Sequence, residues 1–343
     1  PEALMLISKN REFTKFDFSR TLFVDTETTG LAGGSGTYAF LIGVGYFDGS
    51  NFKIRQYFMR DFNEEAAMLY SLQKLFRNFE FIVTFNGKAF DVPLIATRFL
   101  INRMENPLEK FIHLDLLSCA RRLYGERLES VSLSSLEKNL FCITRQGDVP
   151  GYLIPSIYFK FLSDRNPYPL RPVIYHNGMD ILSLVTLTVR IADIFENPIS
   201  SENCVDEDYL CVARVYQDMG FFNESISCYM KALEVPHIQN KAYLQLSMLL
   251  KKLNRWQEAS NLWHYMVEKQ IYEDIALIEL AKYYEHKVKD YIKAAEATEK
   301  AISLLYKKRA MGCSYGYFQS ELKKLKKRQE RLNLKIKRQT NTV

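Results

Sequence analysis

The chain has 343 residues, of which 47% are hydrophobic and 25% charged, as is ordinary for a globular protein of about two domains. No run of about 18 apolar residues occurs, which argues against a membrane-spanning helix. The net charge is +6, and the six cysteines form no C-x-x-C pair, which favours reduced, mostly buried thiols in a cytoplasmic protein over a disulfide framework.

The first chemically informative segment is Asp25-Thr26-Glu27, which directly follows a predicted strand at Thr21–Val24. Side chains alternate along a strand, so the two carboxylates lie on the same face. Such a pair at the end of a buried strand needs a cation or strong hydrogen bonds to compensate its charge. A hard divalent metal such as Mg²⁺ is a natural compensator, although Asp-x-Glu alone is a weak signal.

The segment to about 197 alternates strand-like and helix-like stretches, with a hairpin signal at Asp48-Gly49-Ser50. Three antiparallel strands followed by alternating helix and strand predict a mixed sheet flanked by helices, the α/β class, over residues 1–197. Helices are expected at Asn63–Phe76 and from Asp91 onward. The expected strands are Thr21–Val24, Tyr38–Phe47, Phe52–Phe58, Phe81–Phe85 and Ile112–Asp115.

Asp91 follows a strand and the turn Asn86-Gly87, and stands in the first turn of a predicted helix. It is either an ordinary acid at a helix N-terminus or a third carboxylate of a metal site. His113 and Asp115, at the end of the last predicted strand, could serve the same site, but a single Asp at a strand end is more often structural.

A further predicted helix covers residues 174–184, where His176 and Asp180 are four apart and share one helical face. Apolar residues continue the stripe beyond them, so Asp180 is expected to face the protein interior. The alternative interpretation is a surface Asp–His pair.

The second half has a period of 34 residues. Small residues repeat at this spacing at Ala213, Ser247 and Ala281. Ala232 and Met266 are also 34 residues apart, and the next residue of that series, Ala301, comes one residue late. This period resembles that of tetratricopeptide repeats, each a helix-turn-helix unit. We predict an all-α repeat domain at residues 204–306, after a polar linker at 197–203. Its turns are expected at Gly220, Asn254 and Lys289-Asp290.

The last segment, 307–343, is basic. Twelve Lys or Arg stand against Glu321 and Glu330 between residues 307 and 338, a local charge of +10 that leaves about −4 for the rest of the chain. Such a helix or tail indicates a polyanionic partner. The alternative is a solvated, frayed terminal helix.

Taken together, three motifs carry a family resemblance: Asp25-x-Glu27, then Asn86-x-x-x-Phe90-Asp91, then a His or Tyr shortly before Asp180. This pattern resembles the DEDD superfamily of 3′–5′ exonucleases, and more closely the YprB-type ribonuclease-H-like proteins, some of which carry tetratricopeptide repeats. The resemblance covers about residues 21–195.

The resemblance implies a ribonuclease-H-like fold in which two Mg²⁺ or Mn²⁺ ions hold the attacking water and the leaving 3′-oxygen in line. The implied metal ligands are Asp25, Glu27, Asp91 and Asp180.

Two residues are candidates for the general base, because one subfamily has Tyr four residues before the last Asp and the other has His five before it. This chain has His176 at four and Tyr175 at five. We favour His176 because imidazole titrates near neutrality, with Tyr175 as the runner-up.

The resemblance also implies contacts with nucleic acid at Thr28, Leu31, Asn86 and Lys88. Leu31 would wedge against the terminal base or simply pack, and Lys88 would touch phosphate or face solvent. The predicted function is a metal-dependent 3′–5′ exonuclease of single-stranded RNA or DNA, whose repeats bind a protein partner. The alternative is a catalytically weak nucleic-acid-binding scaffold.

Overall fold

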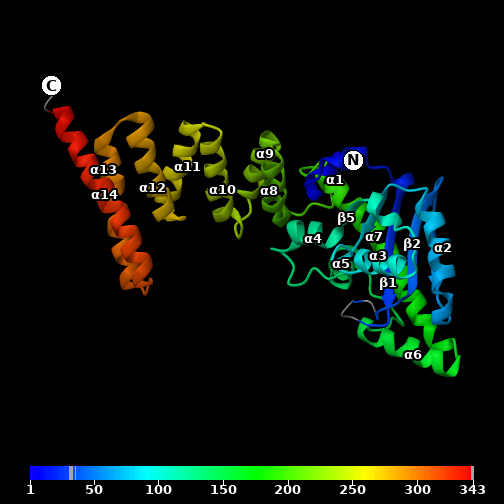
Figure 1. The fold of residues 1–343 in the computed structure, drawn as a ribbon. Helices are drawn as coiled ribbons and strands as arrows, with labels where there is room; N and C mark the ends of the chain where they lie inside the picture. Colours follow the sequence, from blue (N-terminus) through cyan, green and yellow to red (C-terminus); the bar gives the residue numbers. More distant parts are fainter. Residues whose placement is uncertain (31–33, 35, 341–343) are drawn as a thin grey trace. The chain divides into compact units, whose positions relative to one another are not determined.

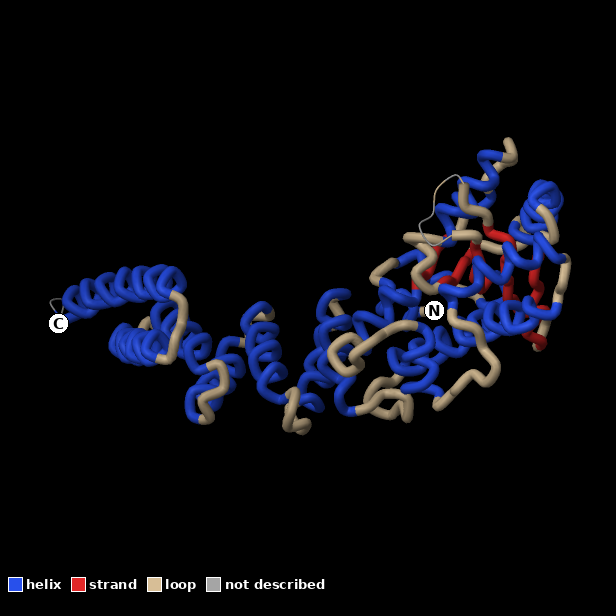
Figure 2. The backbone as a smooth tube through the Cα atoms, turned by 90° about the horizontal axis from the view of Figure 1, so that it is seen from below, coloured by secondary structure: helices blue, strands red, loops and turns tan. Residues whose placement is uncertain are grey.

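The computed structural model describes residues 1–30, 34 and 36–340. The chain divides into two compact units, Pro1–Phe221 and Phe222–Val343 (Figure 1). Among the described residues, every strand belongs to the first unit, and the second is built of helices (Figure 2). The predicted fold class, a mixed sheet flanked by helices and followed by an all-α region, is confirmed.

The first unit contains a five-stranded sheet in the order β3-β2-β1-β4-β5. β1 pairs antiparallel with β2, and β2 with β3, whereas β1–β4 and β4–β5 are parallel. The strands are β1 (Thr21–Thr28), β2 (Ala39–Asp48), β3 (Asn51–Phe58), β4 (Phe81–Thr84) and β5 (Ile112–Asp115).

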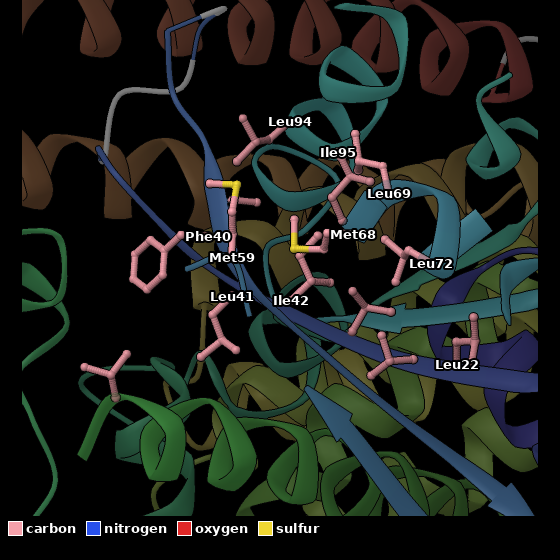
Figure 3. Packing of buried hydrophobic residues seen from close by; sticks show 14 of the residues in the cluster. Leu22, Phe40, Leu41, Ile42, Met59, Met68, Leu69, Leu72, Leu94 and Ile95 are labelled. Atoms are coloured by element: carbon pink, nitrogen blue, oxygen red, sulfur yellow. The ribbon is translucent and has the colours of Figure 1, made fainter. Parts of the chain in front are cut away.

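Helices cover both faces of this sheet, which explains why β1 and β2 are buried almost throughout. On one face, Leu22 and Ile42 pack with Met68 of α2 (Glu65–Phe76) and with Leu94 and Ile95 of α3 (Asp91–Ile101) (Figure 3). Helix α2 begins after a short 3₁₀ turn at Phe62–Glu64, inside the range that the sequence predicts. On the other face, α7 (Arg171–Glu196) packs against β1, β2 and β3.

Five shorter α-helices complete the first unit. Helix α8 contains the first small residue of the 34-residue period, Ala213, yet it packs against α1 and α4 of this unit. The division after Phe221 therefore lies later than the linker expected at 197–203. The five are α1 (Glu2–Ser8), α4 (Leu116–Tyr124), α5 (Leu133–Phe141), α6 (Ile154–Asp164) and α8 (Tyr209–Met219).

In the second unit each helix packs against the next along the chain, as in solenoid proteins. The predicted turn residues Gly220, Asn254 and Lys289 have φ of 87°, 61° and 62°, so each ends a helix in the left-handed conformation. The helices are α9 (Phe222–Ala232), α10 (Gln239–Lys252), α11 (Trp256–Glu268), α12 (Glu273–Tyr283), α13 (Tyr291–Ala310) and α14 (Tyr315–Thr340).

The slip in the period has a structural cause. A π-helical turn at Tyr284–Val288 follows α12, at the place where the 34-residue spacing gains one residue. A π turn accommodates one extra residue without breaking the helix, so Lys289 and Ala301 are displaced by one.

All six cysteines are free thiols, four of them buried. No helix in the described ranges is both long and apolar enough to cross a membrane.

Candidate active site

The site is built where α7 crosses β1 and β2. Asp25 of β1 is paired with Gly43 of β2. A Cβ at Gly43 would lie 2.2 Å from Asn177 Oδ1, and one at Gly45 would lie 2.4 Å from Ile181 Cγ2. Two glycines on one face of β2 therefore let α7 approach the sheet closely, with residues four apart on the helix resting over them.

Asn177 fixes this contact. Its Nδ2 donates to Asp25 Oδ2 at 2.9 Å and to the Asp25 carbonyl at 3.2 Å, and its Oδ1 accepts from Gln56 Nε2 at 2.9 Å. The side chain is completely buried, so its amide is satisfied only in this one position of the helix on the sheet. Asn177 therefore sets the position of the rest of α7 relative to Asp25.

Asp91 reaches the same region from the first turn of α3, where its Oδ1 accepts a hydrogen bond from the Thr26 hydroxyl. The turn before α3 is held by Asp115, whose carboxylate accepts from the backbone N–H groups of Asn86 at 2.9 Å and Lys88 at 3.0 Å. Asp115 thus places Asp91 by fixing the turn. The side chains of Asn86 and Lys88 are exposed.

Asp180 and His176 lie on α7 and belong to a set of contacts that we call the Arg145 network: Arg145, Glu137, Asp148, His176 and Asp180. Arg145 donates from Nη2 to both Asp180 and Glu137, and from Nη1 to Asp148 Oδ2 at 3.3 Å. It also donates from Nε to Glu137 Oε2 at 2.8 Å. The Arg145 side chain is only 8% exposed, so its positive charge interacts mainly with these three carboxylates.

His176 has carboxylates near both ring nitrogens. Its Nδ1 lies 2.8 Å from Asp148 Oδ1, and its Nε2 lies 3.5 Å from Asp180 Oδ2. Tyr175, the other candidate base, is 42% exposed on the same helix. The structure thus brings His176, rather than Tyr175, into contact with a candidate metal ligand.

The four predicted acids act on one another electrostatically. Burial, and then the neighbouring Asp180 and Glu27 charges, raise the pKa of Asp25 well above its ordinary value. Burial, together with Asp180 and Asp91, raises the pKa of Glu27 to about 9.

Burial also raises the pKa of Asp91 to about 6, against the hydrogen bond from Thr26. The pKa of Asp180 is raised by burial, although Arg145 and His176 oppose the shift. Ionising all four acids together would therefore place more negative charge in this buried region than its protein neighbours neutralise.

This donor set fits divalent cations chemically. It offers only carboxylate oxygens, the ligands that Mg²⁺ and Mn²⁺ prefer, and a bound cation would offset the cost of ionising these acids together. Within the described residues, no group of three or more His, Cys, Asp or Glu is already arranged as a metal-binding site. Asp180 is engaged by Arg145 here, so its carboxylate would have to share or exchange that contact to bind a metal.

Two of the residues predicted to contact nucleic acid, Thr28 and Leu31, differ in what the structure describes. Thr28 is buried and its hydroxyl donates to the Gly30 carbonyl at 2.8 Å, so it stabilises the end of β1. Leu31 lies outside the described residues.

The sequence reasoning missed Arg145, Asp148, Glu137 and Asn177. Asn177 had a usable signal, since it directly follows His176 and the strand opposite contains Gly43-x-Gly45, a spacing that indicates close approach. Arg145 and Asp148 lie in the irregular segment after α5 and carry no periodicity that could have marked them.

Comparison with known proteins gives three findings. The RNase_H_2 family profile, described as RNase_H superfamily, matches residues 22–192. The uncharacterized protein YprB of Bacillus subtilis (strain 168) is 35% identical over 295 residues, covering 84% of this chain and 70% of YprB. The structure of the family B DNA polymerase from the hyperthermophilic archaeon Pyrobaculum calidifontis aligns with 58% of this chain and 29% of its own, at 14% identity and a TM-score of 0.40.

Proposed function

Because the chain belongs to the same family as YprB and contains an RNase H superfamily domain, we propose that it is a metal-dependent 3′–5′ exonuclease of single-stranded RNA or DNA. The observation that carries the proposal is the meeting of Asp25, Glu27, Asp91 and Asp180, from β1, α3 and α7, in one electrostatic cluster beside His176. We place this activity in the cytoplasm.

The four carboxylates are the residues that would hold two Mg²⁺ or Mn²⁺ ions. When bound, such ions lower the pKa of the attacking water and neutralise charge on the phosphate. The protein's own contribution is to hold these ligands. Asn177 fixes Asp25, Thr26 fixes Asp91, and Arg145 fixes Asp180.

His176 is the general base in this proposal. A carboxylate can only accept, so the 2.8 Å contact requires that Nδ1 carries the proton and donates it to Asp148. To act as the base, the ring would have to be neutral, with the lone pair of Nε2 on the side of Asp180, where it would take a proton from water. Asp148 thereby selects the tautomer and orients the ring, and it stabilises the imidazolium that forms.

The helical pairs after Asp206 are proposed to be tetratricopeptide repeats that bind a protein partner. Their support is the 34-residue period together with the left-handed residues Gly220, Asn254 and Lys289 at the predicted turns. Solenoids of this kind present extended surfaces to their ligands.

The test is direct. The protein is incubated with 5′-labelled single-stranded RNA and DNA in Mg²⁺ or Mn²⁺, beside Asp25→Ala and a surface control, Glu109→Ala. We expect a ladder that shortens from the 3′ end, is abolished by Asp25→Ala and by chelation, and is kept by Glu109→Ala. Retained binding without degradation in either metal would favour the scaffold alternative.

A further inference from the structure

The basic C-terminal segment is an ordered helix rather than a frayed tail. The apolar side of α14, formed by Phe318, Leu322, Leu325 and Leu332, is buried, and its first three members pack in a cluster with residues of α12 and α13. The helix therefore has a fixed rotational setting, so its other faces present defined sets of charges.

One of these sets of charges forms ion pairs with a buried glutamate of the same unit. Glu285, in the π turn after α12, is 2% exposed and accepts from Arg331 Nε and Nη2 at 2.8 Å and from Lys335 Nζ at 2.8 Å. Arg328 Nη1 adds a bond at 3.2 Å. These three cations hold α14 in place and are not available to a partner.

Another side of α14 carries a second set of cations. At about 100° per residue, the positions of Lys323, Lys326, Lys327 and Lys337 fall within an arc of roughly 100° that lies between the apolar side and the cations that bind Glu285. All four are exposed, and only Glu330 interrupts the set with an acid. We call these four lysines the outer lysine stripe. It extends about 20 Å along the helix at 1.5 Å per residue.

We infer that the outer lysine stripe binds the sugar–phosphate backbone of single-stranded nucleic acid. A line of lysines on a fixed helix matches a line of phosphates, and lysine binds phosphate as a point charge without reading the base. The binding is therefore independent of sequence and sensitive to salt. The choice of nucleic acid among polyanions rests on the proposed function.

A membrane surface is a poorer match. Basic helices that lie on a bilayer insert an apolar face between the lipids. In α14 that face is already buried by Phe318, Leu322, Leu325 and Leu332, so only charge would remain to hold the helix on lipid.

The experiment measures binding of a 5′-fluorescein single-stranded RNA 20-mer by anisotropy between 50 and 300 mM KCl, with chelator present. Full-length protein carries Asp25→Asn throughout, which prevents hydrolysis. The stripe variant has Lys323, Lys326 and Lys327 changed to Gln. The control has exposed Lys15, Lys110 and Lys269 changed to Gln, the same change in net charge at scattered sites.

Loss of three phosphate contacts is expected to reduce the slope of log K against log[KCl] by about 2, and the affinity at 100 mM by tenfold or more. The control should stay within about twofold. Equal slopes for the stripe variant and its parent would overturn the inference, as would stripe-dependent binding to anionic phosphatidylserine vesicles without binding to RNA. Stripe-dependent RNA binding by a protein that never shortens RNA would support this inference while refuting the nuclease proposal.

Discussion

At the scale of single residues, His176 is held between two carboxylates that have different tasks. Asp148 contacts Nδ1 from the segment after α5, whereas Asp180 lies near Nε2 on the same helix. Arg145 binds both carboxylates, so the imidazole and the candidate ligand are positioned by one guanidinium. Orientation of the base and placement of the ligand are therefore coupled.

This arrangement predicts a graded effect on turnover. His176→Ala should lower kcat by about 10² or more, the scale for losing a general base. Asp148→Asn removes the negative charge that stabilises the imidazolium, and its amide N–H can donate to Nδ1 and favour the other tautomer. It should lower kcat by about tenfold and leave KM nearly unchanged, because Asp148 orients His176 and does not contact substrate. Single-turnover and steady-state assays on a labelled 3′ end measure both.

Tyr175→Phe is the matched control, since its exposed hydroxyl lies on the neighbouring position of the same helix and should be dispensable. Normal turnover in His176→Ala together with a large loss in Tyr175→Phe would assign the base to Tyr175.

The four candidate acids and the preferred candidate base could be proposed from the sequence because each stands on a regular element. Asp25 and Glu27 follow from strand alternation, and His176 and Asp180 from helical spacing. Arg145 and Asp148 could not be predicted in this way. They lie outside any regular element, and their contacts with His176 and Asp180 join residues 28 and 35 positions apart, so only the folded chain brings them together. Glu137 lies on helix α5, but nothing in the sequence of that helix indicated that it pairs with the buried Arg145.

At the scale of elements, the contact between α7 and β2 determines the positions of His176 and Asp180, the two candidate site residues on α7. Gly43 lies beneath Asn177, and Gly45 beneath Ile181. The three antiparallel strands and the mixed sheet agree with the sequence prediction, because hairpin signals and apolar runs are local, whereas the strand order β3-β2-β1-β4-β5 was not predicted. The close approach of α7 to β2 was not predicted. It depends on Gly43 and Gly45, which have no side chain to hold the helix away from the sheet.

Gly43→Ala is therefore expected to be costly. A new Cβ at 2.2 Å from Asn177 Oδ1 would force the amide out of its bond to Asp25 or move the helix. We expect a loss of about 1–3 kcal/mol in the free energy of unfolding, as for overpacking elsewhere, and a lower kcat. Chemical denaturation and the exonuclease assay measure the two effects.

The control is Gly178→Ala, at the residue that directly follows Asn177 on α7, where the nearest atom to a new Cβ is Gln56 Nε2 at 3.8 Å. A helical glycine replaced by alanine without a clash should be neutral or stabilising by up to about 1 kcal/mol. Similar losses in both variants would mean that the close approach at Gly43 is not what limits the site.

At the scale of the whole molecule, the two units have separate cores, and each should respond to its own perturbations. In the second unit the principal buried charge is Glu285, which joins the π turn to α14. Burial opposes its ionisation, but hydrogen bonds from Arg331 and Lys335 prevail and lower the pKa of Glu285 to about 2.

The stability that Glu285 contributes is complete above the ordinary glutamate pKa of about 4.5 and is lost as the pH falls from there toward 2. Glu285→Gln should remove it at pH 7, at a cost on the order of 3 kcal/mol to the second unit, because three cations lose their buried partner. Thermal unfolding followed by helical circular dichroism measures this.

Exposed Glu299→Gln is the control and should unfold like the parent protein. Nuclease turnover should be unaffected by Glu285→Gln, since the acids of the first unit are untouched. If Glu285→Gln unfolds at the same temperature as the parent protein, the ion pairs of Glu285 with Arg328, Arg331 and Lys335 do not stabilise α14.

The raised pKa values in the carboxylate cluster make ion uptake an exchange reaction. With a pKa of about 9, Glu27 holds a proton at neutral pH, whereas Asp91, with a pKa of about 6, has mostly released its own. In the proposed nuclease, a divalent ion that takes Glu27 as a ligand must expel that proton to solvent. Below pH 9, the apparent affinity for the ion then rises about tenfold with each unit of increase in pH, for each proton that is displaced. The same four acids that would do the chemistry thus tie ion loading to the acidity of the surroundings.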